Sequence, residues 1–228
     1  MKRFLISLIL VVLVLLLFAG CTPATGASNA PDWMWPSEAS LPEEGGTTVS
    51  VGLEYGSWGN GTCYVYRMGS CQDTELIIPP VAPNGDRVVA IDAQAFAGYT
   101  ELTSVTLPEG LLHIGKAAFS GCDRLATIYL PSGLRQIDER AFEDCKALSS
   151  IHLSAELVYI GEMAFDGCRR LKKVTFDAPM GWQGELGKNG WHTRLEQQVK
   201  IPSEMLSDPS SAADALKDTY VYYIWTRP

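Results

Sequence analysis

Residues 114–131 read IGKAAFSGCDRLATIYLP, and this pattern of apolar side chains recurs along the middle of the chain with a 23-residue period. Six apolar positions keep the interval through four successive units. The phenylalanines that mark the units are Phe96, Phe119, Phe142 and Phe165. A period held at six positions over four units predicts a solenoid in which each unit forms one coil.

Each unit contains a short strand followed by turns. Ile128 and Leu130 alternate with other residues, so both face the same side of a short strand. Pro131 then turns the chain, and Leu134 and Ile137 point inward again. The Ala-Phe pair of each unit predicts a tight helical or 3₁₀ turn. One unit cannot bury these side chains alone, so the coils stack their strands in parallel around a continuous core.

The pattern I-x-x-x-A-F-x-x-C-x-x-L-x-x-I-x-L-P resembles the BspA-like leucine-rich repeats of bacterial surface proteins, over about residues 88–177. Tyr99 replaces the cysteine in the first unit, and Ser154 and Asp177 stand where earlier units have proline. The resemblance implies an α/β solenoid, a right-handed leucine-rich repeat coil of four units with parallel short strands. It also implies adhesion to host matrix proteins, other cells or other surface components.

The segment before the repeats, residues 51–87, resembles the β-rich N-terminal cap of that family. Its own residues agree, because Tyr64 and Tyr66 alternate with other positions and the Gly-Asn-Gly sequence at 59–61 favours a turn. We therefore expect a β-hairpin here. Such a cap covers apolar surface at the open end of a solenoid.

The segment after the repeats, residues 178–228, is similar to the closing segments of such proteins. Asp208 is a good helix N-cap and Pro209 suits the first helical position, so a short helix is expected to run to about Leu216. Tyr220 to Trp225 then predict a terminal strand. The C-terminal cap is thus a helix followed by a strand.

The N-terminus predicts export. Lys2 and Arg3 precede an apolar run from Phe4 to Phe18, which is shorter than the roughly 20 residues of a comfortable membrane span. The run ends in LFAGC at residues 17–21, which resembles a bacterial lipoprotein signal: residues 1–20 are removed and Cys21 carries diacylglycerol. An uncleaved anchor helix is the alternative. In either case the rest of the chain lies outside the cytoplasmic membrane and is held to it.

Residues 21–50 predict a flexible tether, because they are rich in Pro, Ala, Ser, Thr and Gly and have no apolar periodicity. Within the tether, Trp33 and Trp35 form an apolar patch. Three interpretations stay open. The patch is an adhesive apolar spot in a linker, it folds back onto the folded domain, or it contacts a partner.

The charge balance excludes nucleic acid as a partner. The chain has 18 basic and 26 acidic side chains, a net charge of −8, and loss of Lys2 and Arg3 with the signal makes it −10. Nucleic-acid binding requires clustered cations that displace counterions from phosphates.

Enzymatic motifs are also missing from the sequence. His113, His152 and His192 have no metal-ligand spacing, and no glycine-rich phosphate loop or nucleophile elbow is present. The acidic pair Glu143 and Asp144 is expected to be a solvated surface turn. We therefore predict no catalytic residues, no metal and no cofactor.

The cysteines of the repeats predict packing rather than chemistry. Cys122, Cys145 and Cys168 occupy one interior column and are expected to be small buried hydrophobic residues. Cys63 and Cys71 flank a possible strand pair, where a disulfide and two free thiols both stay open.

The outward positions of the repeat strands are the candidate binding residues. Stacking aligns them in two columns on one sheet face, where solenoids commonly recognise partners. They are Ser104, Thr106, Thr127, Tyr129, Ser150, His152, Lys173 and Thr175. The alternative is that they are merely soluble strand residues.

Taken together, these patterns predict a cell-envelope lipoprotein whose solenoid binds protein or glycan partners, with adhesion as the role that the resemblance implies. A second hypothesis is an accessory or structural lipoprotein that holds another envelope protein through the tether. A third is an envelope hydrolase on an unusual scaffold.

Overall fold

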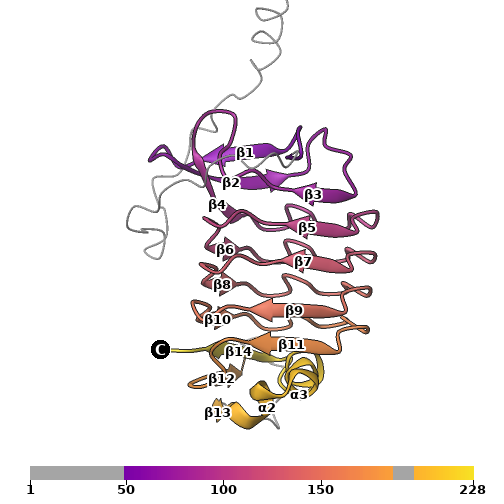
Figure 1. Cartoon of the computed structure of the whole chain (residues 1–228), viewed down its shortest axis with the longest axis vertical. Coiled ribbons are helices and arrows are strands. Elements are labelled where there is room, and N and C mark those ends of the chain that lie inside the picture. Colours follow the sequence, from indigo (N-terminus) through magenta and orange to yellow (C-terminus); the bar gives the residue numbers. More distant parts are fainter. Residues whose placement is uncertain (1–48, 187–197) are drawn as a thin grey trace, which may run out of the picture.

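The computed structural model describes residues 49–186 and 198–228. Within these residues the chain winds as a solenoid whose coils stack along the long axis, with a cap at each end (Figure 1). Neighbouring coils are offset by the repeat period, so that Ser104 lies beside Thr127 and Tyr159 beside Gln136. The repeat and the solenoid predicted from the sequence are therefore confirmed.

The first side of the solenoid is a row of parallel strands. Its strands are β3 (Glu75–Ile77), β5 (Ser104–Thr106), β7 (Thr127–Tyr129), β9 (Ser150–Leu153) and β11 (Lys173–Phe176). Hydrogen bonds join β3, β5 and β7 into one parallel sheet and β9 with β11 into another. Strands β7 and β9 lie next to each other, so the two sheets form one surface (Figure 1).

The second side consists of strands that pair in parallel. They are β4 (Arg87–Ile91), β6 (His113–Ile114), β8 (Gln136–Ile137) and β10 (Tyr159–Ile160), of which β6, β8 and β10 have only two residues each. These strands sit in the middle of a larger sheet whose order in the described residues is β1-β2-β4-β6-β8-β10-β14-β12-β13. The cap strands at its two ends thus continue the solenoid's own sheet.

The third side, which we call the turn face, consists of turns joined by backbone hydrogen bonds between coils. The amides of Phe96, Phe119 and Phe142 each donate to an alanine carbonyl of the next coil at 2.8 Å. The predicted tight turn is present, since the Cys145 amide donates to the Phe142 carbonyl three residues earlier at 3.1 Å, but it does not form a helix. Each coil instead has a non-glycine residue with positive φ before the phenylalanine, which a helix does not tolerate. These residues are Gln94, Ala117, Arg140 and Met163, with φ of 57°, 53°, 57° and 56°.

A column of stacked phenylalanine rings forms the centre of the core. Phe96, Phe119, Phe142 and Phe165 are all fully buried. Successive ring centroids are 5.2, 5.4 and 5.3 Å apart, with interplanar angles of 16°, 2° and 15°. The repeat register fixes this spacing, because each ring sits on the equivalent ring of the neighbouring coil.

The N-terminal cap contains the predicted hairpin. Strand β1 (Glu54–Ser57) pairs antiparallel with β2 (Thr62–Arg67), and the Asn60 side chain accepts a hydrogen bond from the Thr62 amide in the turn. Strand β2 then pairs in parallel with β4, the first strand of the second side. Cys63 and Cys71 are both buried and no disulfide joins them, so the pairing that the sequence left open is not formed.

The C-terminal cap contains the predicted helix and strand. Helix α3 (Pro209–Asp214) begins after Asp208, whose carboxylate accepts a hydrogen bond from the Ser211 amide at 2.8 Å. The helix continues as a wider turn, η1 (Ala215–Thr219), and β14 (Tyr223–Thr226) pairs antiparallel with β10.

The sequence did not indicate three further cap elements. These are β12 (Gln183–Leu186), β13 (Gln198–Lys200) and α2 (Ser203–Ser207). Helix α3 packs against β11, so it covers the last coil of the solenoid (Figure 1). Trp182 and Trp225 are buried and pack edge to face between β12 and β14.

Several sequence-based predictions fall on residues that the structure does not describe. The export signal at 1–20, Cys21 and the tryptophans of the tether lie outside the described residues, as does His192. The described end of the tether reaches the cap: the Ser50 amide donates to the Ile77 carbonyl at 2.8 Å. Among the described residues, no helix combines the length and apolarity needed to cross a membrane.

Candidate partner-binding face

The structure brings all eight predicted binding residues to the outer surface of the first side. Ser104 pairs with Thr127 and Thr106 with Tyr129, while Ser150 pairs with Lys173 and His152 with Thr175. These pairs form two parallel columns, which together we call the strand face. The structure thus has these residues at the outward positions that strand periodicity predicts, and their role in binding stays a prediction.

The residues between these positions point into the core, as the alternation requires. Val105 and Val174 are fully buried, and Ile128 and Ile151 are nearly so. In contrast, Tyr129 on β7 is 63% exposed. A large aromatic side chain that is this exposed offers an amphipathic contact for a partner.

His152 is held in place by two neighbours on the strand face. Its Nδ1 lies 2.8 Å from the Thr175 hydroxyl and its Nε2 lies 3.1 Å from a carboxylate oxygen of Asp177. An ionised carboxylate can only accept, so Nε2 carries the hydrogen and donates it to Asp177. The imidazole ring is therefore oriented in advance of any contact with a partner.

The sequence did not indicate two parts of this face. Asp177 follows β11 at a position where the sequence departs from the repeat, and its carboxylate orients His152. Strand β3 adds a further strand to this face, because Glu75 pairs with Ser104 and Ile77 with Thr106. The step along the chain from β3 to β5 is longer than the repeat period, since a longer loop precedes β4. The fixed 23-residue period in the sequence therefore does not include β3.

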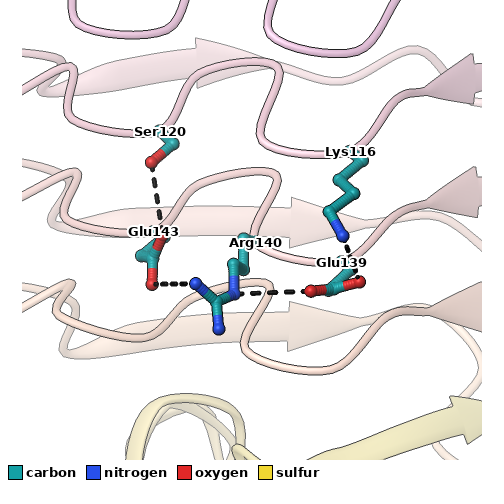
Figure 2. Close-up of polar contacts among 5 residues, drawn as sticks. All are labelled: Lys116, Ser120, Glu139, Arg140 and Glu143. Carbon is teal, nitrogen blue, oxygen red and sulfur yellow. Dashed lines mark hydrogen bonds and ion pairs between the residues drawn. The ribbon is translucent and has the colours of Figure 1, made fainter. Parts of the chain in front are cut away.

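The turn face differs from the strand face because its charged side chains bind one another (Figure 2). Lys116 Nζ lies 2.8 Å from Glu139, and the same carboxylate lies 3.4 Å from Arg140 Nε. Arg140 also contacts Glu143 at 3.7 Å, and the Ser120 hydroxyl donates to Glu143 at 3.3 Å. The charges shown in Figure 2 are therefore satisfied within the protein and leave less to attract a partner.

The three cysteines of the repeats are not nucleophiles. Burial raises the pKa of the Cys122 and Cys168 thiols to about 12, and it raises the pKa of Cys145 further. A thiol must ionise to attack, so these groups are inert near neutral pH. In the described part of the chain, no three metal-ligating side chains gather into a possible metal site.

A small cavity of about 260 Å³ lies where the N-terminal cap meets the first coil. Met68, Cys71, Tyr99 and Leu102 supply its apolar side chains, and Asp73 and Glu101 lie at its rim. Tyr99 stands where the later coils have a buried cysteine, and its side chain is 38% exposed. The cavity thus lies next to the end of the cysteine column.

Comparison with protein families identifies the repeats. The model of the BspA type leucine-rich repeat region matches residues 71–181 in six copies. Residues 71–181 are therefore a leucine-rich repeat region of the BspA type. The match begins before residue 88 and so includes β3, in agreement with the additional strand on the strand face. Proteins of this family are often surface-associated and are generally non-enzymatic binding scaffolds.

A solved leucine-rich repeat structure supports the fold. A leucine-rich repeat protein from Bacteroides capillosus is 28% identical, with a TM-score of 0.51 over 57% of this chain and 100% of that chain. A T. pallidum leucine-rich repeat protein is 32% identical, with a TM-score of 0.49 over 53% of this chain. The chain spans 56% of the length of the T. pallidum protein structure. Comparison with curated proteins gave no match.

Proposed function

We propose that this protein is an extracytoplasmic lipoprotein whose solenoid binds protein or glycan partners at the cell surface through the strand face. The observation that carries the proposal is the exposed Tyr129, which lies in one of the two aligned columns of the strand face. Exposed aromatic side chains commonly anchor partners, and the frequent surface association of the family supports an encounter outside the cell. Adhesion is the biological role that we infer, without a catalytic step.

In the domain organisation that we propose, a flexible tether connects the strand face to the membrane. Residues 1–20 would be the lipoprotein signal, and residues 21–50 the tether that links lipidated Cys21 to the solenoid. Residues 51–87, 88–177 and 178–228 would be the N-terminal cap, the four repeats and the C-terminal cap. The lipid would hold the protein to the membrane while the tether lets the strand face reach a partner.

Lipidation of Cys21 can be tested independently of binding. The full chain with Cys21→Ser should be released from membranes and should no longer incorporate labelled fatty acid, because the acceptor sulfur is gone. A substitution of the next residue, Thr22→Ser, leaves the cysteine intact and is the matched control. Fatty-acid labelling that persists in the Cys21→Ser variant would show that this sulfur is not the attachment point.

The binding role is tested on arrays of matrix proteins and glycans with the full chain. Tyr129→Ala should lower the affinity for the partner at least tenfold, as expected for loss of an aromatic anchor worth about 2 kcal/mol or more. Tyr66→Ala removes an exposed tyrosine from β2, away from the strand face, and should leave affinity unchanged. Unfolding temperatures of both variants should match that of the unmodified chain.

Two outcomes of the array experiment would contradict the proposal. Equal binding by the Tyr129→Ala and Tyr66→Ala variants would show that the strand face is not the contact. Binding that survives Tyr129→Ala but disappears when residues 22–50 are deleted would favour an accessory lipoprotein that acts through its tether.

A further inference from the structure

The last coil of the solenoid holds an unusual concentration of positive charge for an acidic protein. Arg169, Arg170, Lys172 and Lys173 lie close together at the turn that leads into β11, and all four are exposed. The chain as a whole carries a net charge of −8. We call these four residues the basic corner, because they lie where the turn face meets the strand face.

The cations of the basic corner have no carboxylate partners within the described residues. None of the four takes part in an ion pair there, whereas Lys116, Arg124, Arg140 and Lys146 in the two preceding coils each contact an acidic side chain. These pairs form mostly between coils, as when Lys146 meets Asp123 at 3.0 Å. Four neighbouring unpaired cations repel one another, so an anion that binds among them gains energy that it would not gain at the other coils.

The reason for this lack of partners lies in the repeat itself. The residues one period earlier lie directly beside the basic corner in the preceding coil, and they are Lys146, Ala147, Ser149 and Ser150. None of them is acidic, and Lys146 already pairs with Asp123. On the other side of the coil, the C-terminal cap packs against β11 through α3. The preceding coil therefore supplies no counter-charge.

Hydroxyl groups adjoin the basic corner on the strand face. Ser150 lies beside Lys173 in the register, Ser149 precedes Ser150, and Thr127 stands next in the same column, all exposed. Cations next to a row of hydroxyls match a polymer that carries both anionic groups and hydroxyls. Arginine is especially suited to such groups, because its guanidinium binds a sulfate or phosphate with two parallel hydrogen bonds.

We propose that the basic corner binds an anionic polysaccharide, with its sulfate, phosphate or carboxylate groups on the four cations and its hydroxyls along Ser149 and Ser150. The inference deepens the proposed function and rests on it, since Lys173 belongs both to the strand face and to the basic corner. It specifies which class of glycan the protein selects. An acidic protein surface and an anionic membrane fit less well, because neither supplies hydroxyls in a row.

Binding of the full chain to dextran sulfate tests this inference, with neutral dextran as the uncharged reference. We expect dextran sulfate to bind, neutral dextran not to bind, and affinity to fall as salt rises. The double variant Arg169→Gln and Arg170→Gln should weaken binding by roughly tenfold or more, because hydrogen bonds to charged groups are lost. The matched control, Arg87→Gln with Arg135→Gln, removes the same charge elsewhere and should change affinity little.

Three results would overturn the inference. They are absence of binding to dextran sulfate, equal loss in the two double variants, and binding to polyglutamate or to vesicles with anionic lipid that exceeds binding to dextran sulfate. The Tyr129→Ala variant, measured in parallel on the arrays, keeps the two proposals apart. If Tyr129 matters for a neutral glycan or a protein while dextran sulfate does not bind, the proposed function stands and the basic corner has no part in it.

Discussion

The Cys145 thiol donates a hydrogen bond to the backbone carbonyl of Phe119, with the sulfur and oxygen atoms 3.2 Å apart. Cys122 does the same to Phe96 and Cys168 to Phe142, each at 3.1 Å. In every case the cysteine lies one coil after the phenylalanine whose carbonyl it contacts. The cysteine column is therefore a set of bridges between coils as well as a set of small buried side chains.

These buried thiols predict a loss of stability at alkaline pH. The pKa of Cys122 rises from an ordinary 9.0 to about 12 on folding, chiefly because burial disfavours the thiolate. Above pH 9 the unfolded chain loses this proton while the folded chain keeps it, so the free energy of unfolding falls as pH rises toward 12. The loss is about 1.4 kcal/mol per pH unit for each such thiol.

Urea denaturation at pH 8 to 10.5 measures the alkaline effect. Cys122→Ala is the comparison, because it removes one titrating thiol and should make the decline with pH less steep even though it lowers stability at pH 8. A free energy of unfolding that stays constant across this range would mean that the thiols ionise equally well in the folded chain.

The phenylalanine stack predicts a severe effect of truncation at its centre. Phe142 is fully buried between Phe119 and Phe165, so Phe142→Ala should lower the free energy of unfolding by roughly 3–5 kcal/mol through lost burial and the cavity left behind. Phe142→Leu keeps most of the volume and should cost less. Urea denaturation of both variants checks this, and a near-neutral alanine variant would show that the column is not the core.

Much of this core could be predicted from the sequence, because the repeat interval fixes which side chains stack. Phe142 and Cys145 needed only the repeat to be placed in the interior, and their burial is confirmed. The turn before each phenylalanine could not be predicted in this way. Its conformation depends on backbone hydrogen bonds to the next coil, and those override the helical preference of the Ala-Phe pair.

The strand face was predictable for a similar reason, since alternation along each strand decides which residues point outward. Tyr129 and His152 were placed correctly by period two alone. Their interactions were not, because the contact between His152 and Asp177 joins residues whose separation differs from the repeat interval. Strands β12 and β13 were missed as well. Strand β12 pairs with β14 and β13 pairs with β12, and these tertiary pairings have no periodic pattern in the sequence.

The charge pairs of the turn face predict only small contributions to stability. Lys116 and Glu139 lie 2.8 Å apart, but their side chains are 55% and 28% exposed, so water screens the attraction. A double-mutant cycle with Lys116→Ala and Glu139→Ala should give a coupling energy of about 0.2–1 kcal/mol. The coupling should fall further at high salt, and a value well above this range at low salt would contradict this account.

Asp144 predicts a stabilising substitution. It has φ of 56°, in the left-handed region, at the position where the neighbouring coils have Gly121 with φ of 73° and Gly167 with φ of 70°. A side chain in this conformation is strained and glycine is not, so Asp144→Gly should raise the free energy of unfolding by roughly 0.5–1 kcal/mol. The hydrogen bond from the Asp144 amide to the Asp166 carbonyl, 2.7 Å long, involves only the backbone and is retained.

The reciprocal substitution, glycine to aspartate, also tests whether a side chain at this positive-φ position is strained. Gly121→Asp places a side chain where a Cβ atom would meet Gly98 Cα at 3.7 Å, an ordinary contact, so the backbone strain is its main cost. Gly121→Asp should therefore lower the free energy of unfolding while Asp144→Gly raises it, both measured by urea denaturation. If both substitutions destabilise the protein, the Asp144 side chain contributes more to the turn than its strained backbone costs.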